Sequence, residues 1–437
     1  MTEPVQALVR DVELSRPLPA IAPVDGDGRA AFRAYVLVRM CTEPIGTVLL
    51  DVPSTELGAS DLAAAIEARL GDRIRERADA AGARMTGPLD AGGIRIGGDV
   101  PYLVERDAVL AEAPHITVAV CTRNQPDGLR RLLDSVVGCV YPRYRILVID
   151  NAPADDRAER VARAAAEHAP VSYVREPRPG LSNARNRALV ETRGEIVAWT
   201  DDDAVADEFW LAEIARALHR NPSADVVSGP IVPAELVTRP QLWFESFGGH
   251  SKGRGFTPFV FAPPYQQDPL FPLPPFGTGA NMAWRPGVAE SIGGFDPALG
   301  AGTPAMGSED TLAFMSVLRA GGTIVYHPGA IVRHYHRRDI DGLRRQLTGY
   351  GTGLTAAYAS LVRSHPASLI ELARLAPRAL RELYSGSGLR AGGLDDDFPR
   401  DLLRANRRGM LCGPFAYVRG RRRPAPMVAR DRVGNRL

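Results

Sequence analysis

The stretch GEIVAWTDDDAVADEFWL, residues 194–211, runs an apolar, strand-like segment directly into three aspartates. Adjacent carboxylates repel one another, and a fold that crowds them also removes the water that solvates them. Such a cluster either lies on an open, hydrated turn or surrounds a cation. The segments on either side of it indicate which of the two applies.

Apolar strand-like segments alternate with helical segments over the region that leads to these aspartates. The expected strands are residues 115–123, 144–153, 171–180 and 194–203. The expected helices are residues 126–138, 155–169 and 181–193. This alternation predicts an α/β fold with a mostly parallel sheet and helices on both of its faces.

Polar side chains follow several of these strands at the points where the strands end. Thr122 and Arg123 follow the first strand, Asp150 the second, and Asp201 to Asp203 the last. In open α/β sheets ligands bind outside the carboxyl ends of the strands. We therefore expect these distant residues to meet at one edge of the sheet.

Composition excludes several classes of protein. A net charge of only +2 over 437 residues gives no sign of nucleic-acid binding. The four cysteines show no CxxC spacing, which is typical of buried thiols in a reducing compartment. The first residues lack a signal-peptide pattern, and no apolar window approaches about 18 residues. We expect a cytoplasmic protein.

The last part of the chain is strongly basic. Residues 400–437 hold eleven arginines and two aspartates, a net charge of about +9. A solvated tail explains this composition. Attraction to an anionic membrane surface, worth about 1 kcal/mol per basic residue, is the functional alternative and allows a peripheral location.

The order of the motifs resembles that of the family 2 glycosyltransferases, inverting enzymes with the GT-A fold. The resemblance covers about residues 115–338. Five separated motifs carry it: VAVCTRNQPDGLRRLLDSV (118–136), ILVIDNAP (146–153), RPGLSNARNRAL (178–189), VAWTDDDAVADEFWL (197–211) and GSEDTLAFMSVLRAGGTIVYHPGAIVRH (307–334). It implies transfer of a sugar from a nucleoside-diphosphate sugar to a hydroxyl acceptor, which is a lipid, a glycan or a small molecule.

With this resemblance the expected chain has three parts. The first, at 1–110, is a small α+β module of unknown role, with strands at 32–40 and 46–53 and a helix at 59–82 capped by Ser60 or Asp61. The second is a GT-A domain at 111–339, in which 230–276 forms a folded substrate loop without regular elements. The third is a helical, arginine-rich extension at 340–437.

The resemblance gives the three aspartates a role with Mg²⁺ or Mn²⁺, which stabilises the charge of a diphosphate leaving group. Asp203 would bind the metal, Asp201 would contact the ribose or a metal-bound water, and Asp202 could share either role. The alternative is a solvated turn in which Asp207 caps the following helix.

The same resemblance implies further donor contacts. Asp150 would accept a hydrogen bond from the nucleotide base, although an Asx turn explains it too. Thr122 and Arg123 would touch base or phosphate. Arg185 would pair with phosphate through its planar guanidinium, with an exposed helix arginine as the alternative.

On the acceptor side, Asp310 would be the general base that an inverting displacement requires. Together with Ser308 and Glu309 it also resembles a helix N-terminus with acids in its first turn, and both interpretations can hold. Glu309 is placed on the acceptor side.

His334 and His336 lie at the end of an expected strand, residues 323–336, and would be on one face of it. The resemblance implies that His334 binds the metal or contacts the diphosphate, and it implies such a role less strongly for His336. The alternative is that both histidines lie at a solvated strand end. Trp284 either offers a stacking face to a sugar or belongs to the core.

Two other functions are alternatives to a glycosyltransferase. A nucleotidyltransferase would carry a glycine-rich, basic phosphate loop after the first strand, where this chain has CTRNQPDG. A non-catalytic scaffold that keeps the fold would lose the paired aspartates or the acceptor-side acid, and both are present.

Overall fold

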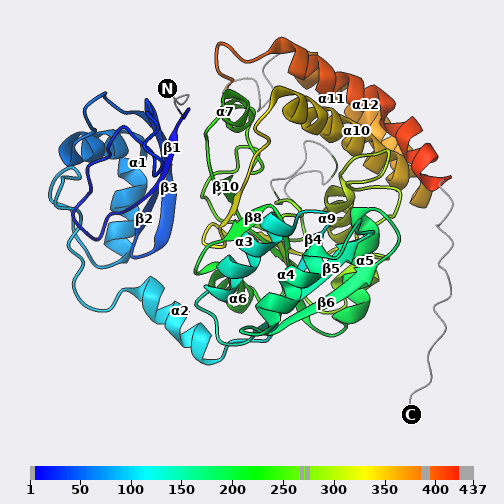
Figure 1. Cartoon of the computed structure of the whole chain (residues 1–437), viewed down its shortest axis with the longest axis horizontal. Helices are drawn as coiled ribbons and strands as arrows, with labels where there is room; N and C mark the ends of the chain where they lie inside the picture. The colour runs from blue at the N-terminus through cyan, green and yellow to red at the C-terminus, as the bar shows by residue number, and fades with distance from the viewer. Residues whose placement is uncertain (1–4, 266–269, 271–275, 385–393, 423–437) are drawn as a thin grey trace.

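The computed structural model describes residues 5–265, 270, 276–384 and 394–422. The first part of the chain forms a three-stranded sheet with one long helix packed on it, at the left of Figure 1. Its elements are β1 (Leu8–Glu13), β2 (Arg33–Met40), β3 (Glu43–Asp51) and α1 (Ala59–Ala80). A separate cluster of buried side chains fills the space between this sheet and α1. The helix α2 (Pro101–Ala111) follows.

This part differs from the sequence-based expectation in three ways. The strand β1 was missed, and it pairs in parallel with β2, while β2 and β3 are the two expected strands and pair antiparallel. The helix α2 was also missed. The N-cap of α1 is Gly58 without a side-chain hydrogen bond, so the prediction of a Ser60 or Asp61 cap was wrong.

The central element is an eight-stranded sheet with the order β11-β13-β9-β12-β7-β4-β5-β6. Four strands are mutually parallel neighbours: β4 (Ile116–Thr122), β5 (Tyr144–Asn151), β6 (Val171–Glu176) and β7 (Ile196–Asp201). The other half contains β9 (Val226–Ser228), β11 (Phe259–Phe261), β12 (Asn281–Trp284) and β13 (Ile324–Tyr326). In that half β12 runs antiparallel to both of its neighbours.

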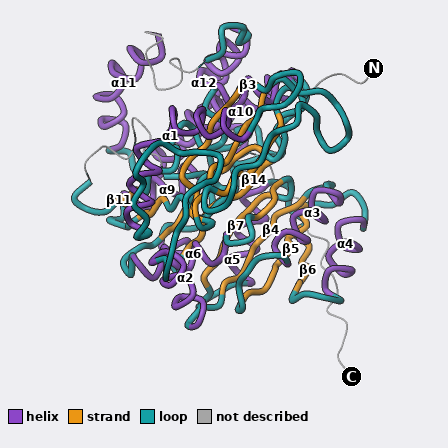
Figure 2. The backbone as a smooth tube through the Cα atoms, turned by 90° about the vertical axis from the view of Figure 1, so that its left-hand side faces the viewer, coloured by secondary structure: helices purple, strands orange, loops and turns teal. Residues whose placement is uncertain are grey.

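Helices cover both faces of this sheet. The helices α3 (Pro126–Val137), α4 (Arg157–Ala166) and α6 (Trp210–Arg220) share one buried cluster. The helices α5 (Leu181–Glu191) and α9 (Glu309–Arg319) share the other. In β4, Val118 and Val120 face the first cluster and Ala119 the second, as a strand buried on both faces requires. Figure 2 shows α3 and α4 on one side of these strands and α5 on the other. The predicted α/β fold is confirmed.

Two expected segments have a different structure. The segment 323–336 is not one strand but two, β13 and β14 (Val332–His334), because Pro328 and Gly329 form a turn between them. Residues 230–265 contain regular elements that were not expected: β10 (Ile231–Pro233), α7 (Arg239–Ser246) and β11. At the start of α7 the backbone N–H of the N-cap residue Thr238 donates to Gln241 Oε1. This N–H has no partner in the helix itself, so the glutamine side chain supplies one. The rest of the expected substrate loop lies largely outside the described residues.

The third sheet has the order β10-β14-β8 and links three distant segments, with β8 at Ala204–Ala206 directly after the aspartates. A short helix, α8 (Val288–Ser291), follows β12. Because β14 lies between β8 and β10, its last residue, His334, is brought beside the aspartate turn.

Three helices form the C-terminal part, at the top of Figure 1: α10 (Ile340–Ser364), α11 (Ser368–Tyr384) and α12 (Arg400–Arg421). Glycines allow α10 and α12 to approach closely. A Cβ on Gly409 would lie 2.2 Å from the Thr348 carbonyl oxygen, and one on Gly351 would lie 2.0 Å from that of Asn406. Within the described residues, none of the helices has the length and apolar character needed to cross a membrane.

Candidate active site

A cavity of about 430 Å³ opens at the carboxyl ends of the central strands. The ends of β4 and β7, the beginning of α9 and the end of β14 all contribute to its wall. Nine residues named from the sequence line it: Thr122, Arg123, Arg185, Asp201, Asp202, Asp203, Glu309, Asp310 and His334. The parallel topology thus brings together side chains from five separate segments.

Asp202 is held against the end of β4. Its Oδ2 accepts a hydrogen bond from Thr122 Oγ1 at 2.6 Å, and the backbone N–H of Arg123 lies 3.4 Å from the same oxygen. Burial and the neighbouring Asp203 raise the pKa of Asp202 to about 7. Gly128 allows α3 to approach this turn, because a Cβ there would lie 2.5 Å from the Asp202 carbonyl oxygen. Thr122 and Asp202 therefore fix the turn on which the other two aspartates sit.

Asp201, Asp203 and His334 form one group at the edge of the cavity. His334 Nε2 lies 3.0 Å from Asp203 Oδ1 and 3.9 Å from Asp201 Oδ2. Burial would raise the pKa of Asp203, but the charge of His334 and its hydrogen bond outweigh burial and lower it. Burial would lower the pKa of His334, but the charge of Asp203 raises it instead. In this state a proton on the imidazole balances the carboxylates.

The donor chemistry of this group fits a divalent cation. One potential ligand atom from each of the three residues lies within 4.8 Å of the others. Two carboxylates and an imidazole suit Mg²⁺ or Mn²⁺, which bind few protein ligands and leave places for phosphate oxygens and water. A cation in this place would replace the proton that His334 holds.

Arg185 crosses the floor of the cavity from α5. It is 2% exposed, and its Nη1 donates to Glu309 Oε1 at 2.8 Å. Its Nη2 donates to the Gly279 carbonyl oxygen at 3.1 Å and lies 3.8 Å from Asp201 Oδ1. Burial raises the pKa of Glu309 to about 7, with Arg185 opposing this effect and Asp310 adding to it. Arg185 is therefore a buried cation that lies between Asp201 and Glu309, and not an exposed helix residue.

Asp310 lies in the first turn of α9. Its Oδ2 accepts a hydrogen bond from the Gly279 N–H at 2.6 Å, and its Oδ1 accepts one from the Thr311 N–H at 2.6 Å. Ser308 is the N-cap residue, but its side chain makes no capping hydrogen bond. Backbone groups thus orient the Asp310 carboxylate at the cavity wall.

Trp284 and Asp207 do not have the positions that the sequence predicted for them. Trp284 is 1% exposed, does not line the cavity, and packs in the core with its ring 6.0 Å from that of Phe314. The acceptor-side prediction for Trp284 was wrong, because β12 is covered on both faces and the indole fills the space under α9. Asp207 is not the N-cap residue of α6, because Phe209 has that position. The carboxylate of Asp207 forms an ion pair with Arg39 instead.

Asp150 is also outside the group that the structure brings together. It is fully buried and does not line the cavity. Tyr173 donates a hydrogen bond to its Oδ2 at 2.7 Å, while Oδ1 has no partner. Burial raises the pKa of Asp150. The contact with a base that was expected from the sequence therefore requires a rearrangement that exposes this carboxylate.

Asn151, which ends β5 as the sequence predicted, lines the cavity, and its side chain holds the loop before α5 by accepting from the Gly180 N–H and donating to the Arg178 carbonyl oxygen. His250 was not found from the sequence. It lines the cavity from the loop after α7, beside Lys252, the only lysine in the chain. The lone lysine in the glycine-rich GGHSKG turn was the available signal for it.

Comparisons with known proteins agree on one family. The sequence model described as "Glycosyl transferase family 2" matches residues 117–292. The succinoglycan biosynthesis protein ExoM of Rhizobium meliloti is 30% identical over 229 residues, which are 51% of this chain and 67% of that protein. The glucosyl-dolichyl phosphate glucuronosyltransferase of Haloferax volcanii is 22% identical over 231 residues, 50% of this chain and 68% of that one.

Among solved structures, the mannosyltransferase PcManGT from Pyrobaculum calidifontis, in complex with GDP-Man and Mn²⁺, aligns with a TM-score of 0.42 and 21% identity. The alignment covers 73% of this chain and 79% of that one.

This chain is an enzyme of the glycosyltransferase class. It belongs to glycosyltransferase family 2. Membership of this family sets aside both the nucleotidyltransferase and the scaffold alternatives.

Proposed function

We propose that this glycosyltransferase moves a sugar from a nucleoside-diphosphate sugar to a hydroxyl acceptor, with inversion and with the help of Mg²⁺ or Mn²⁺. The observation that supports the proposal is the meeting of Asp201, Asp203 and His334 with Arg185 and Asp310 around one cavity. The cationic side chains favour a diphosphate on one side of this cavity, and the carboxylate of Asp310 lies at the wall on the other.

The donor would lie along the carboxyl ends of β4 and β7. Asp203 and His334 would hold the metal, with Asp201 as a third ligand or as a contact to ribose or bound water. When bound, the cation stabilises the negative charge that grows on the leaving diphosphate. Arg123 and Arg185 would add hydrogen-bond donors for base or phosphate groups, whereas the Thr122 hydroxyl donates to Asp202 and keeps the turn in place.

The acceptor would approach from the side of α9. The hydroxyl oxygen forms a bond to the anomeric carbon, and the bond from that carbon to the phosphate oxygen breaks, with its electron pair leaving on the diphosphate. Asp310 takes the hydroxyl proton. Glu309 keeps Arg185 in position by its hydrogen bond of 2.8 Å. A single displacement of this kind inverts the configuration of the sugar carbon.

Thermal stabilisation by UDP, GDP, TDP and CDP, each with and without Mn²⁺, tests the donor side. A ligand that binds only the folded state at 100 times its Kd adds about 2.7 kcal/mol of stability. We expect one of the four nucleotides to stabilise the chain, and only when Mn²⁺ is present. The Asp203→Asn variant should lose this stabilisation.

Asp134→Asn is the matched control, because Asp134 is an exposed carboxylate on α3. It should leave the nucleotide effect intact. Absence of any stabilisation by all four nucleotides in the wild type would contradict the nucleotide-sugar proposal.

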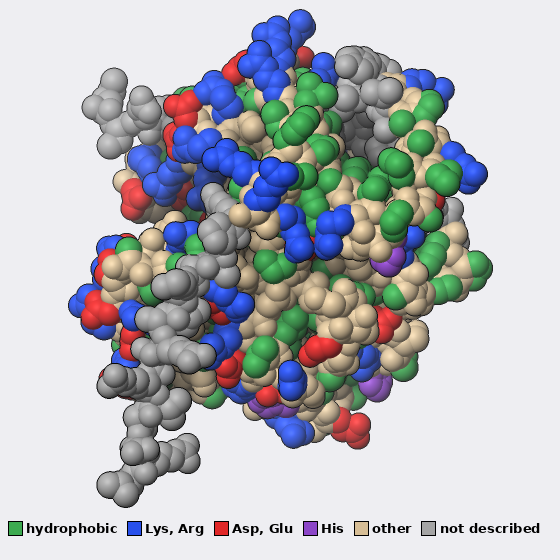
Figure 3. All heavy atoms as spheres, turned by 90° about the vertical axis from the view of Figure 1, so that its right-hand side faces the viewer, with side chains coloured by type: hydrophobic (Ala, Val, Ile, Leu, Met, Phe, Trp, Pro, Cys, Tyr) green, Lys and Arg blue, Asp and Glu red, His purple; other side chains and the backbone are tan. Residues whose placement is uncertain are grey.

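We also propose that α12 touches an anionic membrane surface. Leu411 and Phe415 are 77% and 80% exposed, and Val418 is 47% exposed, at a spacing that places all three along one side of a helix. Exposed arginines lie at both ends of α12: Arg400, Arg404, Arg407, Arg408, Arg419, Arg421 and Arg422. Figure 3 shows basic and hydrophobic side chains gathered on the upper part of the face toward which α12 extends. Apolar side chains between cations fit an anionic interface.

Sedimentation with lipid vesicles tests this contact. We expect binding to vesicles that contain phosphatidylglycerol, weaker binding to pure phosphatidylcholine, and a loss of about tenfold in Phe415→Ser, in line with the buried apolar area. Phe32→Ser, at a residue 61% exposed in the N-terminal part, is the control. Equal losses in both variants, or no binding to anionic vesicles, would overturn the proposal.

A further inference from the structure

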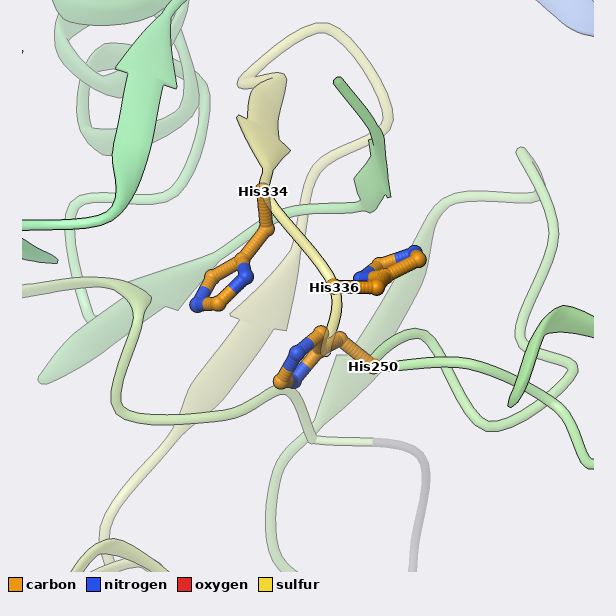
Figure 4. Close-up of side chains that lie close together, drawn as sticks. All are labelled: His250, His334 and His336. Atoms are coloured by element: carbon orange, nitrogen blue, oxygen red, sulfur yellow. The ribbon is translucent and has the colours of Figure 1, made fainter. Parts of the chain in front are cut away.

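Three imidazoles gather next to the proposed donor site, and the proposed mechanism uses only one of them. His334 and His336 come from the end of β14 and the residues after it, and His250 comes from the loop after α7 (Figure 4). One nitrogen from each ring lies within 4.8 Å of the others. The rings of His250 and His334 have centroids only 4.2 Å apart.

The hydrogen bonds of His336 leave one nitrogen bare. His336 is 4% exposed, and its Nε2 lies 2.8 Å from Glu245 Oε1. The carboxylate accepts the proton of Nε2, so the lone pair of the ring lies on Nδ1, which has no partner. A histidine whose other nitrogen donates to a carboxylate is the usual arrangement of a metal ligand.

His250 presents a second bare nitrogen, because its Nε2 is buried without a partner. His334 differs from the other two rings. Its Nδ1 donates to the Tyr335 carbonyl oxygen at 3.0 Å and its Nε2 lies 3.0 Å from Asp203 Oδ1, so Nε2 must release its proton before it binds a cation. Phe244 packs edge-on against His250 and His336 and limits their rotation.

From this geometry we infer a second cation position, formed by His250, His334 and His336, which takes a borderline divalent ion such as Zn²⁺ or Co²⁺. Three neutral imidazoles suit these ions, whereas carboxylates and water suit Mg²⁺ and Mn²⁺. The ligand nitrogens of a tetrahedral zinc ion lie roughly 3.4 Å apart, so small side-chain rotations bring the three rings into range.

The surrounding charges are mixed. Glu245 and Asp203 favour a cation, whereas Lys252 and Arg337 oppose it, and Arg337 lies 3.6 Å from Asp203 Oδ2. The position therefore depends on ligand bonds more than on net charge. This favours ions that bind imidazole strongly.

The two cation positions share His334, and this gives the second position a regulatory consequence. Nε2 of His334 can bind at only one cation position at a time, and it faces Asp203 at 3.0 Å in the proposed donor site. A Zn²⁺ ion bound by the three imidazoles withdraws this nitrogen from Asp201 and Asp203. We expect one equivalent of Zn²⁺ to suppress the stabilisation by nucleotide and Mn²⁺.

Calorimetric titration of the metal-free full chain with Zn²⁺, and visible absorption with Co²⁺, test the inference. We expect one tight equivalent in the wild type. His250→Gln and His336→Gln should each weaken Zn²⁺ binding by at least tenfold. Glu245→Gln keeps all three imidazoles and should weaken it about 10- to 100-fold. His168→Gln, at an exposed histidine, is the matched control and should bind as the wild type does.

Asp203→Asn separates the two positions. It should keep the Co²⁺ spectrum and the Zn²⁺ affinity while it loses stabilisation by nucleotide and Mn²⁺. Melting curves without metal show whether each variant is folded. If a histidine variant is not folded, Glu245→Gln, which keeps all three imidazoles, tests the Zn²⁺ position in its place. Unchanged Zn²⁺ affinity in His250→Gln, His336→Gln and Glu245→Gln overturns the inference, whereas failure of nucleotide binding in the wild type overturns only the proposed donor site.

Discussion

Arg185 is a buried cation beside Glu309. It donates to Glu309 and to the Gly279 carbonyl oxygen and lies 3.8 Å from Asp201. A buried carboxylate without a cation costs several kcal/mol, so Glu309 depends on the position of this guanidinium. Gly279 leaves the space in which that guanidinium lies.

Gly279→Ala tests this dependence. The new Cβ would lie 2.4 Å from Arg185 Nη2, so the guanidinium must move. We expect nucleotide affinity to fall by about tenfold, which corresponds to about 1.4 kcal/mol. Gly26→Ala is the control, since a Cβ there meets nothing within 4 Å. Titration calorimetry measures both, and equal affinities would show that Arg185 plays no part in binding.

Asp310→Asn tests the proposed base. The amide keeps the size of the side chain but cannot take the acceptor proton, so kcat should fall by about 10²- to 10⁴-fold. Nucleotide affinity with Mn²⁺ should stay within a factor of about two, because Asp310 faces the acceptor. Steady-state transfer rates and the thermal shift measure the two effects, and a wild-type kcat in the variant would contradict the assignment.

The helix α6 is fixed to the sheet by a buried charged group. Oε2 of Glu213 accepts a hydrogen bond from Arg216 Nε at 2.9 Å and lies 2.8 Å from His327 Nε2, in the turn after β13. Burial would raise the pKa of Glu213, but the hydrogen bond and charge of His327 and the charge of Arg216 outweigh burial and lower it to about 2. The group holds the turn that precedes β14.

Glu213→Gln should therefore lower the free energy of unfolding at pH 7 by about 3 kcal/mol, as the loss of one partner from a buried pair does. A folded-state pKa of about 2, against an ordinary value of 4.5, gives stability that is complete above about pH 4.5 and is lost as the pH falls toward 2. Urea unfolding from pH 7 to 3 should show the two proteins converging. Glu208→Gln, at an exposed neighbour, should change little, and a pH-independent difference would contradict the assignment.

The elements were predictable to different degrees. Strands and helices between residues 115 and 203 follow from short apolar runs and helical patterns, and the structure confirms them. The helix α7 was missed because its segment is rich in proline and aromatic residues, which hid a helix that is stabilised by Phe244 packing between His250 and His336. β1 was missed because a six-residue strand with half-buried positions has little pattern of its own.

The N-terminal sheet is tied to the central part by charged residues from three distant segments. Arg39 is 9% exposed and donates from Nε to Asp11 Oδ2 at 3.0 Å, and it also pairs with Asp207, just before α6. Asp11 in turn accepts from Arg333 of β14. The backbone N–H of Ala7 donates to the Leu236 carbonyl oxygen beside this network.

Arg39→Leu should destabilise the whole chain. It leaves Asp207, which is 8% exposed, without its cation, and the expected loss is about 3 kcal/mol in the free energy of unfolding. Arg33→Leu removes only a pair with the exposed Asp51 and should stay within about 0.5 kcal/mol. Denaturant unfolding compares the two variants, and similar losses would show that the Arg39 network does not join the parts.

The sequence by itself determined the α/β alternation, the ends of the strands and most of the polar side chains that meet there. Local patterns suffice for this, because parallel strands bring their carboxyl ends to one edge whatever the details of packing. Tertiary structure alone decided that Trp284 points into the core, that Tyr173 donates a hydrogen bond to the buried Asp150, and that His250 lies beside His334. These outcomes depend on register and on contacts between residues far apart in the chain, which no local pattern encodes.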